Sequence, residues 1–233
     1  MLILLDCSPK KITEYSKKYK YQFGQLRTPL TGYKWCERPY AIDNGAFTKF
    51  NYRGWLRLIE QARLFVPRPF FVACPDIVGD ARRTLELYQH FSIQLGGLPR
   101  ALVLQDGIEN LKIPWDNLEA IFIGGTNEFK ESKIAKDCCK TAKILGKWTH
   151  VGRVNTAKRV AEYAGLADSI DGSGISRFDH MLKSVLSSVK KLPLEQRVCI
   201  RNLSCAESGG LIRRSKNLSN KKKLKLNENV KSM

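Results

Sequence analysis

The sequence has few of the residues that build metal sites and none of the long apolar runs that cross membranes. It contains three histidines, and its seven cysteines include no Cys-x-x-Cys pair. Because zinc ligands normally come in closely spaced pairs, no metal and no other cofactor is expected. No apolar stretch approaches the roughly 20 residues of a membrane helix, so a membrane partner is not expected either.

An export signal is also missing from the apolar start of the chain. Met1 to Leu5 is short, follows no basic region and runs into Asp6, so it is expected to be a first strand and not a signal peptide. The cysteines are odd in number and scattered along the chain, which is typical of reduced thiols. We therefore expect a cytoplasmic protein.

Acidic residues are scarce relative to basic ones. The chain has 22 Asp and Glu against 40 Lys and Arg, a net charge of +18. Residues 10–38 hold eight basic and two acidic side chains, and residues 213–233 hold eight basic and one acidic. Such clusters favour a polyanionic partner, because each neutralised phosphate releases counterions. Nucleic acid is the expected partner; the run of Lys221, Lys222 and Lys223 is a candidate phosphate contact or else a solvated tail.

The apolar runs that are present are short and alternate with helical patterns, which indicates parallel strands joined by helical crossovers. At 233 residues the chain fits one domain. We predict an α/β fold, a compact TIM-like (β/α)8 barrel over residues 1–210. A basic tail at 211–233, poor in apolar periodicity, is expected to be flexible.

The expected strands are residues 2–5, runs ending at 43, 76, 105 and 124, residues 148–151, a run ending at 171, and a short eighth at 197–200. The stretch between the first two is expected to be a long basic insertion reaching Pro39. The expected helices are 52–65, Asp80 (as cap) to 91, one long helix from Asn127 (as cap) to about 146, Asn155 (as cap) to 163, and 177–192.

Several strand ends carry groups that suit base and sugar chemistry. In a parallel barrel these ends meet at one mouth. Asp171 ends one run and is followed by glycine. A carboxylate there can act as a nucleophile toward a glycosidic carbon, with a second carboxyl group, Asp43, as acid and base. The alternative for each is a turn-capping aspartate, and His150 is expected to pack in the core.

The order of these motifs resembles the tRNA-guanine transglycosylase family, the queuine and archaeosine enzymes with their compact DNA-acting 7-deazaguanine relatives. Asp43-Asn44-Gly45-Ala46-Phe47 is similar to the family's Asp-Ser-Gly-Gly-aromatic motif. The resemblance implies that Asp43 is the general acid and base and that Phe47 stacks on the exchanged base.

Later segments extend the resemblance to about residue 178. It implies that Asp76, Gln105, Gly124 and Gly125 bind the base. Ile170-Asp171 followed by Arg177 is similar to the family's nucleophile segment, which implies a phosphate contact for Arg177.

The sequence departs from the family pattern in ways that favour DNA over tRNA as the substrate. Asn44 and Ala46 replace a serine and a glycine, and the family's zinc site and extra domain have no counterpart. The expected function is exchange of guanine in DNA for a free 7-deazaguanine base of the preQ0 or preQ1 type, with an accessory protein as a further partner. Three alternatives stay open: the same exchange on tRNA, a catalytically silent nucleic-acid-binding subunit, and a barrel enzyme for a small phosphorylated sugar.

Overall fold

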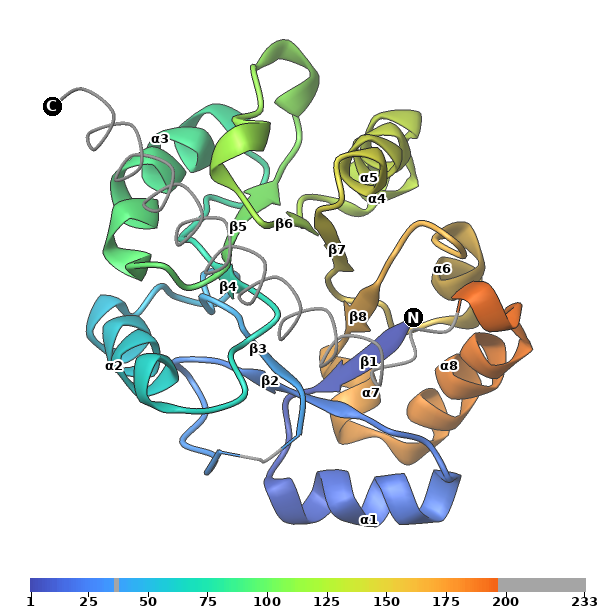
Figure 1. Ribbon diagram of the computed structural model, residues 1–233. Helices are drawn as coiled ribbons and strands as arrows, with labels where there is room; N and C mark the ends of the chain where they lie inside the picture. The colour runs from blue at the N-terminus through green and yellow to red at the C-terminus, as the bar shows by residue number, and fades with distance from the viewer. Residues whose placement is uncertain (36–37, 197–233) are drawn as a thin grey trace, which may run out of the picture. The chain divides into compact units, whose positions relative to one another are not determined.

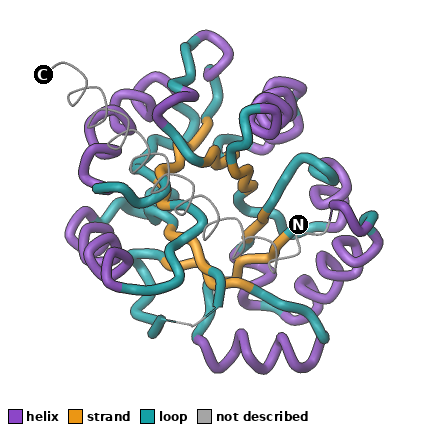
Figure 2. Tube along the Cα trace, viewed as in Figure 1, coloured by secondary structure: helices purple, strands orange, loops and turns teal. Residues whose placement is uncertain are grey.

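A computed structural model of the chain describes residues 1–35 and 38–196. Within them, eight parallel strands close into a barrel, and they follow one another around it in chain order. Strand β8 pairs with β1, with Leu2 opposite Ser169 and Ile3 opposite Ile170. Figure 1 shows the strands at the centre and the helices around them, and Figure 2 shows the same alternation by type of structure. The predicted TIM-like α/β barrel is confirmed.

The strands are β1 (Leu2–Leu5), β2 (Gly24–Arg27), β3 (Tyr40–Ile42), β4 (Val72–Ala73), β5 (Arg100–Leu104), β6 (Ala120–Ile123), β7 (Trp148–Val151) and β8 (Ser169–Asp171). The α-helices are α1 (Pro9–Tyr19), α2 (Tyr52–Leu64), α3 (Ala81–Phe91), α4 (Asn127–Glu131), α5 (Lys133–Ile144), α6 (Ala157–Glu162), α7 (Ser173–Arg177) and α8 (Asp179–Lys191). Short 3-10 helices are η1 (Ser92–Leu95), η2 (Ile108–Asn110), η3 (Trp115–Asn117) and η4 (Leu194–Gln196).

The prediction of a long basic insertion near the N-terminus is wrong. This segment forms a regular helix and strand of the barrel. Ser8 caps α1, and β2 then lies between β1 and β3. The sequence of β2 hides its position, because buried Gln25 and Arg27 interrupt any apolar pattern. Gln25 Nε2 is satisfied by the carbonyls of Cys7 and Lys34, and a Cβ on Gly24 would lie 2.6 Å from Leu4.

Three predicted helices are divided or capped differently. The long helix predicted from Asn127 is two helices, α4 capped by Thr126 and α5 capped by Ser132. Thr156, not Asn155, caps α6. The helix predicted from Arg177 is split between α7 and α8. Asp80 caps α3 as predicted. The predicted strand at 197–200 and the tail at 211–233 lie outside the described residues.

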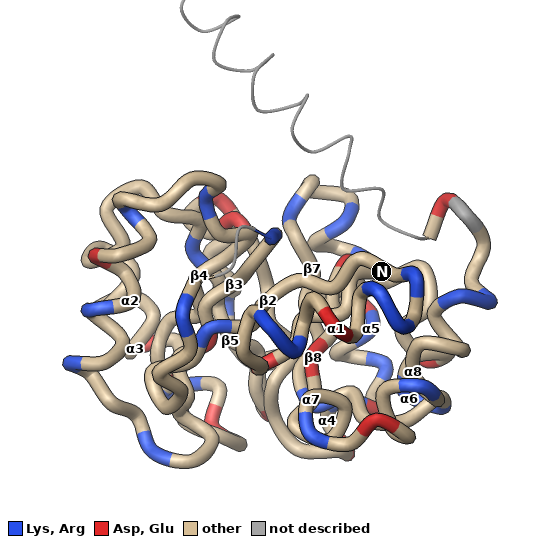
Figure 3. Tube along the Cα trace, turned by 90° about the horizontal axis from the view of Figure 1, so that it is seen from below, with Lys and Arg blue, Asp and Glu red and all other residues tan. Residues whose placement is uncertain are grey.

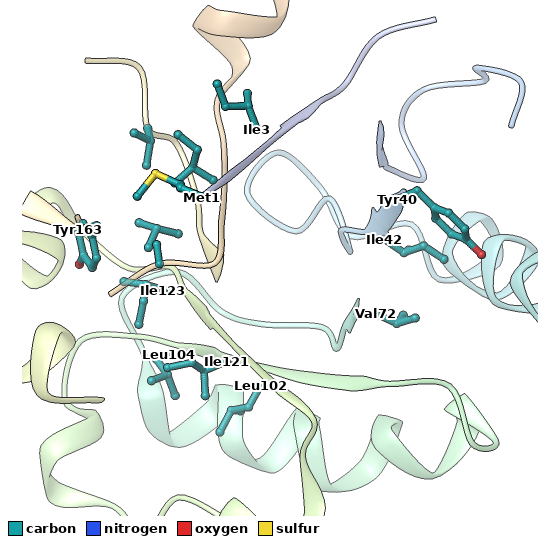
Figure 4. Close-up of a cluster of buried hydrophobic side chains, with 14 of the residues drawn as sticks. Met1, Ile3, Tyr40, Ile42, Val72, Leu102, Leu104, Ile121, Ile123 and Tyr163 are labelled. Carbon is teal, nitrogen blue, oxygen red and sulfur yellow. The ribbon is translucent and has the colours of Figure 1, made fainter. Parts of the chain in front are cut away.

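The main core lies between the strands and the helices. Its members include Ile3, Ile42 and Leu102 from the barrel and Trp55 from α2, all at most 1% exposed. Figure 4 shows part of this cluster, with side chains from β1, β3, β5 and β6. Burial of one such aliphatic side chain contributes roughly 1.5–3 kcal/mol, so this layer fixes the strand ends that carry the polar groups.

A second layer, of rings, fills the interior of the barrel. Phe71, Phe122 and His150 pack together, with ring centroids 4.5 Å apart for Phe122 and His150 and 4.9 Å apart for Phe71 and His150. His150 is fully buried, as predicted. This layer is the floor on which the pocket described below is built, since Phe122 also lines that pocket.

Basic side chains are distributed over the outer elements, and Asp and Glu occur at fewer places (Figure 3). Part of the N-terminal basic cluster is already engaged in contacts within the chain. Lys18 pairs with Asp179 at 2.8 Å, Lys11 Nζ donates to the carbonyl of Ser176, and Arg27 is 5% exposed. The exposed remainder, which is open to a polyanion, comprises Lys10, Lys17, Lys20 and Lys34.

Candidate active site

A pocket opens where the carboxyl ends of β3 to β8 meet, with about 450 Å³ of empty space that is partly open to solvent. Seven predicted site residues line it together: Asp43, Phe47, Asp76, Gln105, Gly124, Gly125 and Asp171. The other lining residues are Asn44, Val78, Val103, Phe122, Lys130, Gly152 and Arg153. Residues up to 128 positions apart in the chain are thus brought to one mouth by the parallel barrel.

Arg177 does not line this pocket. It lies in a neighbouring cavity of about 560 Å³, with Asp6, Lys11 and Tyr33. Asp6 interacts electrostatically with both Asp171 and Arg177, so this cavity flanks the pocket on the side of β1. The run Lys221 to Lys223 lies outside the described residues.

Asp171 is the last residue of β8 and is held through one oxygen. His150 Nε2 lies 3.0 Å from Oδ1, and the backbone N–H of Arg153 donates to the same atom at 3.3 Å. On the other side of the ring, His150 Nδ1 lies 2.8 Å from Ser169 Oγ, which also accepts from Trp148 Nε1 at 2.8 Å. Because a carboxylate oxygen can only accept, the contact with Asp171 Oδ1 requires a proton on His150 Nε2.

This chain of contacts leaves Asp171 Oδ2 without a hydrogen bond from residues 1–35 or 38–196. The carboxylate is 15% exposed, whereas His150 is not exposed at all. Asp171 is therefore a rigidly oriented carboxylate with one oxygen available to a ligand.

Asp43 follows β3 and lies in a different electrostatic environment. Its Oδ1 accepts from the backbone N–H of Asn44 at 2.8 Å. Burial raises the pKa of Asp43 to about 7, and the nearby negative charges of Asp171 and Asp76 raise it further. A carboxyl group with this pKa exchanges a proton readily near neutral pH.

Asp76 accepts hydrogen bonds from two amides. Asn44 Nδ2 donates to Oδ1 at 2.8 Å, and Gln105 Nε2 donates to Oδ2 at 2.6 Å. Gln105 is oriented in turn by the backbone N–H of Gly79, which donates to its Oε1 at 3.0 Å. Burial raises the pKa of Asp76, and the two amides oppose that rise. Asn44 thus supplies one of the two amides that hold this carboxylate.

The glycine pair after β6 keeps this wall of the pocket thin. A Cβ on Gly124 would lie 2.7 Å from Val103 Cγ1 and 2.8 Å from Gln105 Nε2. Gly125 has a φ of +71°, which favours glycine. Any side chain here would displace Gln105 or strain the turn.

Phe47 and Arg153 form the rim. Phe47 is 65% exposed, and the Arg153 guanidinium lies over its ring, 4.3 Å from the centroid. Arg153 also donates to the carbonyl of Gly125 and has a φ of +59°, a left-handed conformation that is uncommon outside glycine. An exposed aromatic face beside a cavity is suited to stacking on a flat heterocycle.

Sequence reasoning missed Lys130 and Arg153 and the link from His150 to Asp171. The link from His150 to Asp171 could have been found from the alternation of side chains along β7 and β8. His150 pairs with Ser169 on the neighbouring strand, and Asp171, two residues further on, points to the same side of the sheet. For Lys130 the sequence holds no such signal, since lysines on helices are nearly always exposed.

The described residues contain no group of His, Cys, Asp and Glu side chains able to hold a metal ion. In the same part of the chain, no helix combines the length and the apolar character that crossing a membrane requires. Of the cysteines placed by the structure, Cys7, Cys74, Cys138 and Cys139 are free thiols.

Comparison with models of known protein families finds no match, and comparison with curated proteins finds none either. What the pocket does has to be inferred from its own residues.

Proposed function

We propose that this chain exchanges guanine in a nucleic acid for a free 7-deazaguanine base through a covalent intermediate on Asp171. The observation that carries the proposal is that Asp43 and Asp171 line one pocket, which also contains the Asp76 carboxylate held between two amides. A guanine-type edge offers N–H donors at N1 and N2, which such a carboxylate can accept.

In the first half of the reaction, Asp171 attacks C1′ of the nucleotide. A C–O bond forms, the glycosidic C–N bond breaks, and its electrons go to guanine, which takes a proton from Asp43. In the second half, Asp43 removes the N9 proton of the incoming base, N9 attacks C1′, and Asp171 leaves as a carboxylate. Neither half requires a redox cofactor or an energy source.

The net charge of +18 favours a polyanionic partner, which a nucleic acid would be. The departures from the tRNA enzymes favour DNA. In a duplex the target nucleotide has to leave the base stack, at a cost of roughly a few kcal/mol. Phe47, on the rim, offers a ring on which an extruded base can stack.

A catalytically silent binding subunit is the weaker alternative. Three carboxylates in one pocket, Asp43, Asp76 and Asp171, oppose the binding of a phosphate backbone, so a protein that only binds gains nothing from them. The proposed reaction, by contrast, gives each carboxylate a role: Asp171 is the nucleophile, Asp43 carries the proton, and Asp76 accepts hydrogen bonds from the base.

The test is incorporation of radiolabelled guanine into DNA and into tRNA by the full chain. Asp171→Ala is expected to abolish incorporation and to leave nucleic-acid binding within a few fold. Asp137→Asn, which removes an exposed carboxylate paired with Lys140, is the charge-matched control and should remain active. Incorporation by Asp171→Ala, or none by the wild type on either nucleic acid, would overturn the proposal.

A further inference from the structure

Lys130 is a buried lysine in the wall of the pocket. It belongs to α4, is 1% exposed, and lines the cavity beside Gly125 and Arg153. Its Nζ makes no hydrogen bond with any residue that the structure describes. Lysine is almost never fully buried unless it is paired, because desolvating an ammonium group is costly. An unpaired one at a cavity indicates that its partner is a ligand.

The environment of Lys130 is cationic on one side. Burial lowers its pKa to about 7, and the positive charge of Arg153 is the next cause. Opposing this, Asp171 raises the pKa. The side chain is therefore ready to donate hydrogen bonds to an acceptor and is poorly placed to receive another cation.

The polar groups follow a fixed order around the barrel. Asp76 follows β4, Gln105 follows β5, Lys130 follows β6, Arg153 follows β7, and Asp171 ends β8. Because the strands neighbour one another in that order, an acidic wall at β4 leads to a cationic wall at β6 and β7 and then to the nucleophile.

The edges of a guanine follow the same order. Starting from the N1 and N2 donors, its perimeter passes O6, then position 7, then C8, and returns to N9 and the sugar. If the donors meet Asp76, C1′ meets Asp171 and the O6 edge turns toward Gln105 and not toward the Asp43 carboxyl group, position 7 falls against Lys130 and Arg153.

We propose that Lys130, with Arg153, determines specificity at position 7, selecting an incoming base whose substituent there accepts a hydrogen bond, such as a nitrile, over one that carries an aminomethyl cation. This inference rests on the proposed function. A protonated aminomethyl group would place a third positive charge beside two others in a partly desolvated pocket, whereas a nitrile would give Lys130 the acceptor it lacks. We expect a preference of about 10- to 100-fold.

The test measures kcat/KM of the full chain for 7-cyano- and 7-aminomethyl-7-deazaguanine, with unsubstituted 7-deazaguanine as a reference. Lys130→Met removes the charge at similar volume and is expected to reduce the ratio of the two kcat/KM values at least tenfold. Because it replaces an unpaired buried charge by an apolar side chain, it should melt no lower than the wild type. Lys133→Met, an exposed lysine on α5, is the matched control and should keep the preference.

Titration calorimetry with the free bases separates this inference from the proposed reaction. If no base is incorporated but the wild type binds the nitrile base more tightly and Lys130→Met does not, the specificity assignment stands and the reaction falls. If exchange occurs but the aminomethyl base is used equally well or better, or the ratio is unchanged in Lys130→Met, the role of Lys130 is refuted and the reaction stands.

Discussion

Replacing Asp43 by asparagine should stabilise the protein while removing its activity. Asp43 shares its pocket with Asp76 and Asp171, and burial together with their charges raises its pKa from 3.8 to about 7. The folded protein therefore holds this proton more tightly than the unfolded chain does. The stability of the fold is unaffected below pH 4, decreases as the pH rises from about 4 to about 7, and levels off above that.

The size of the effect follows from the width of that window. Each pKa unit corresponds to about 1.4 kcal/mol, so the ionised carboxyl group lowers the free energy of unfolding by at most roughly 4 kcal/mol at pH 8. The mouth of the pocket admits water, which reduces the penalty, and about 2–4 kcal/mol is expected. Asparagine keeps the shape of the side chain and cannot ionise, so Asp43→Asn regains this energy.

Urea unfolding of wild type and Asp43→Asn at pH 5, 6, 7 and 8 measures the effect, with a guanine-exchange assay on the same samples. The variant's advantage should grow steadily with pH and its exchange should be lost. Asp137→Asn changes an exposed carboxyl group whose pKa is lowered by Lys140, and should show no such growth between pH 5 and 8. Parallel curves for wild type and Asp43→Asn would refute the claim that this carboxyl group ionises near neutral pH.

Two further variants test other parts of the proposal. His150→Phe keeps the ring layer but removes the hydrogen bond to Asp171; the loss of about 1.5–3 kcal/mol for a bond to a charged group should lower kcat about 10- to 100-fold with little change in KM. Recovery in His150→Gln would indicate positioning, and an unchanged kcat in His150→Phe would exclude it. Removing residues 213–233 should weaken DNA binding and reduce its dependence on salt, and an identical salt slope would show that the tail makes no phosphate contact.

The barrel could be predicted from the sequence because most of its strands are short apolar runs ending at distinctive residues. Runs such as Ala120–Ile123 are buried at every position and are followed by glycine. The exception was β2, whose buried Gln25 and Arg27 donate to the backbone carbonyls of Cys7, Lys34 and Tyr33. Hydrogen bonds of this kind leave no periodic pattern of apolar residues in the sequence. A strand that depends on them is therefore predicted as a loop.

The same limit applies to the site. Residues directly at strand ends, such as Asp43 and Gln105, could be placed because a parallel barrel has only one mouth. Lys130 lies beyond the strand, on the short helix α4, which ends before Ser132 caps α5. Arg153 depends on a left-handed backbone conformation that no local preference favours.

The two catalytic carboxyl groups proposed here come from different strands and have different surroundings. At Asp171, His150 and the backbone of Arg153 both direct N–H groups at Oδ1 and fix the orientation of the carboxylate. Asp43 is buried and lies near the negative charges of Asp171 and Asp76, which together raise its pKa to about 7 and favour a proton on this group. The arrangement is asymmetric before any ligand binds. Because Asp43→Asn is expected to abolish exchange by itself, adding His150→Phe should lower the exchange rate no further, so the two losses should not be additive.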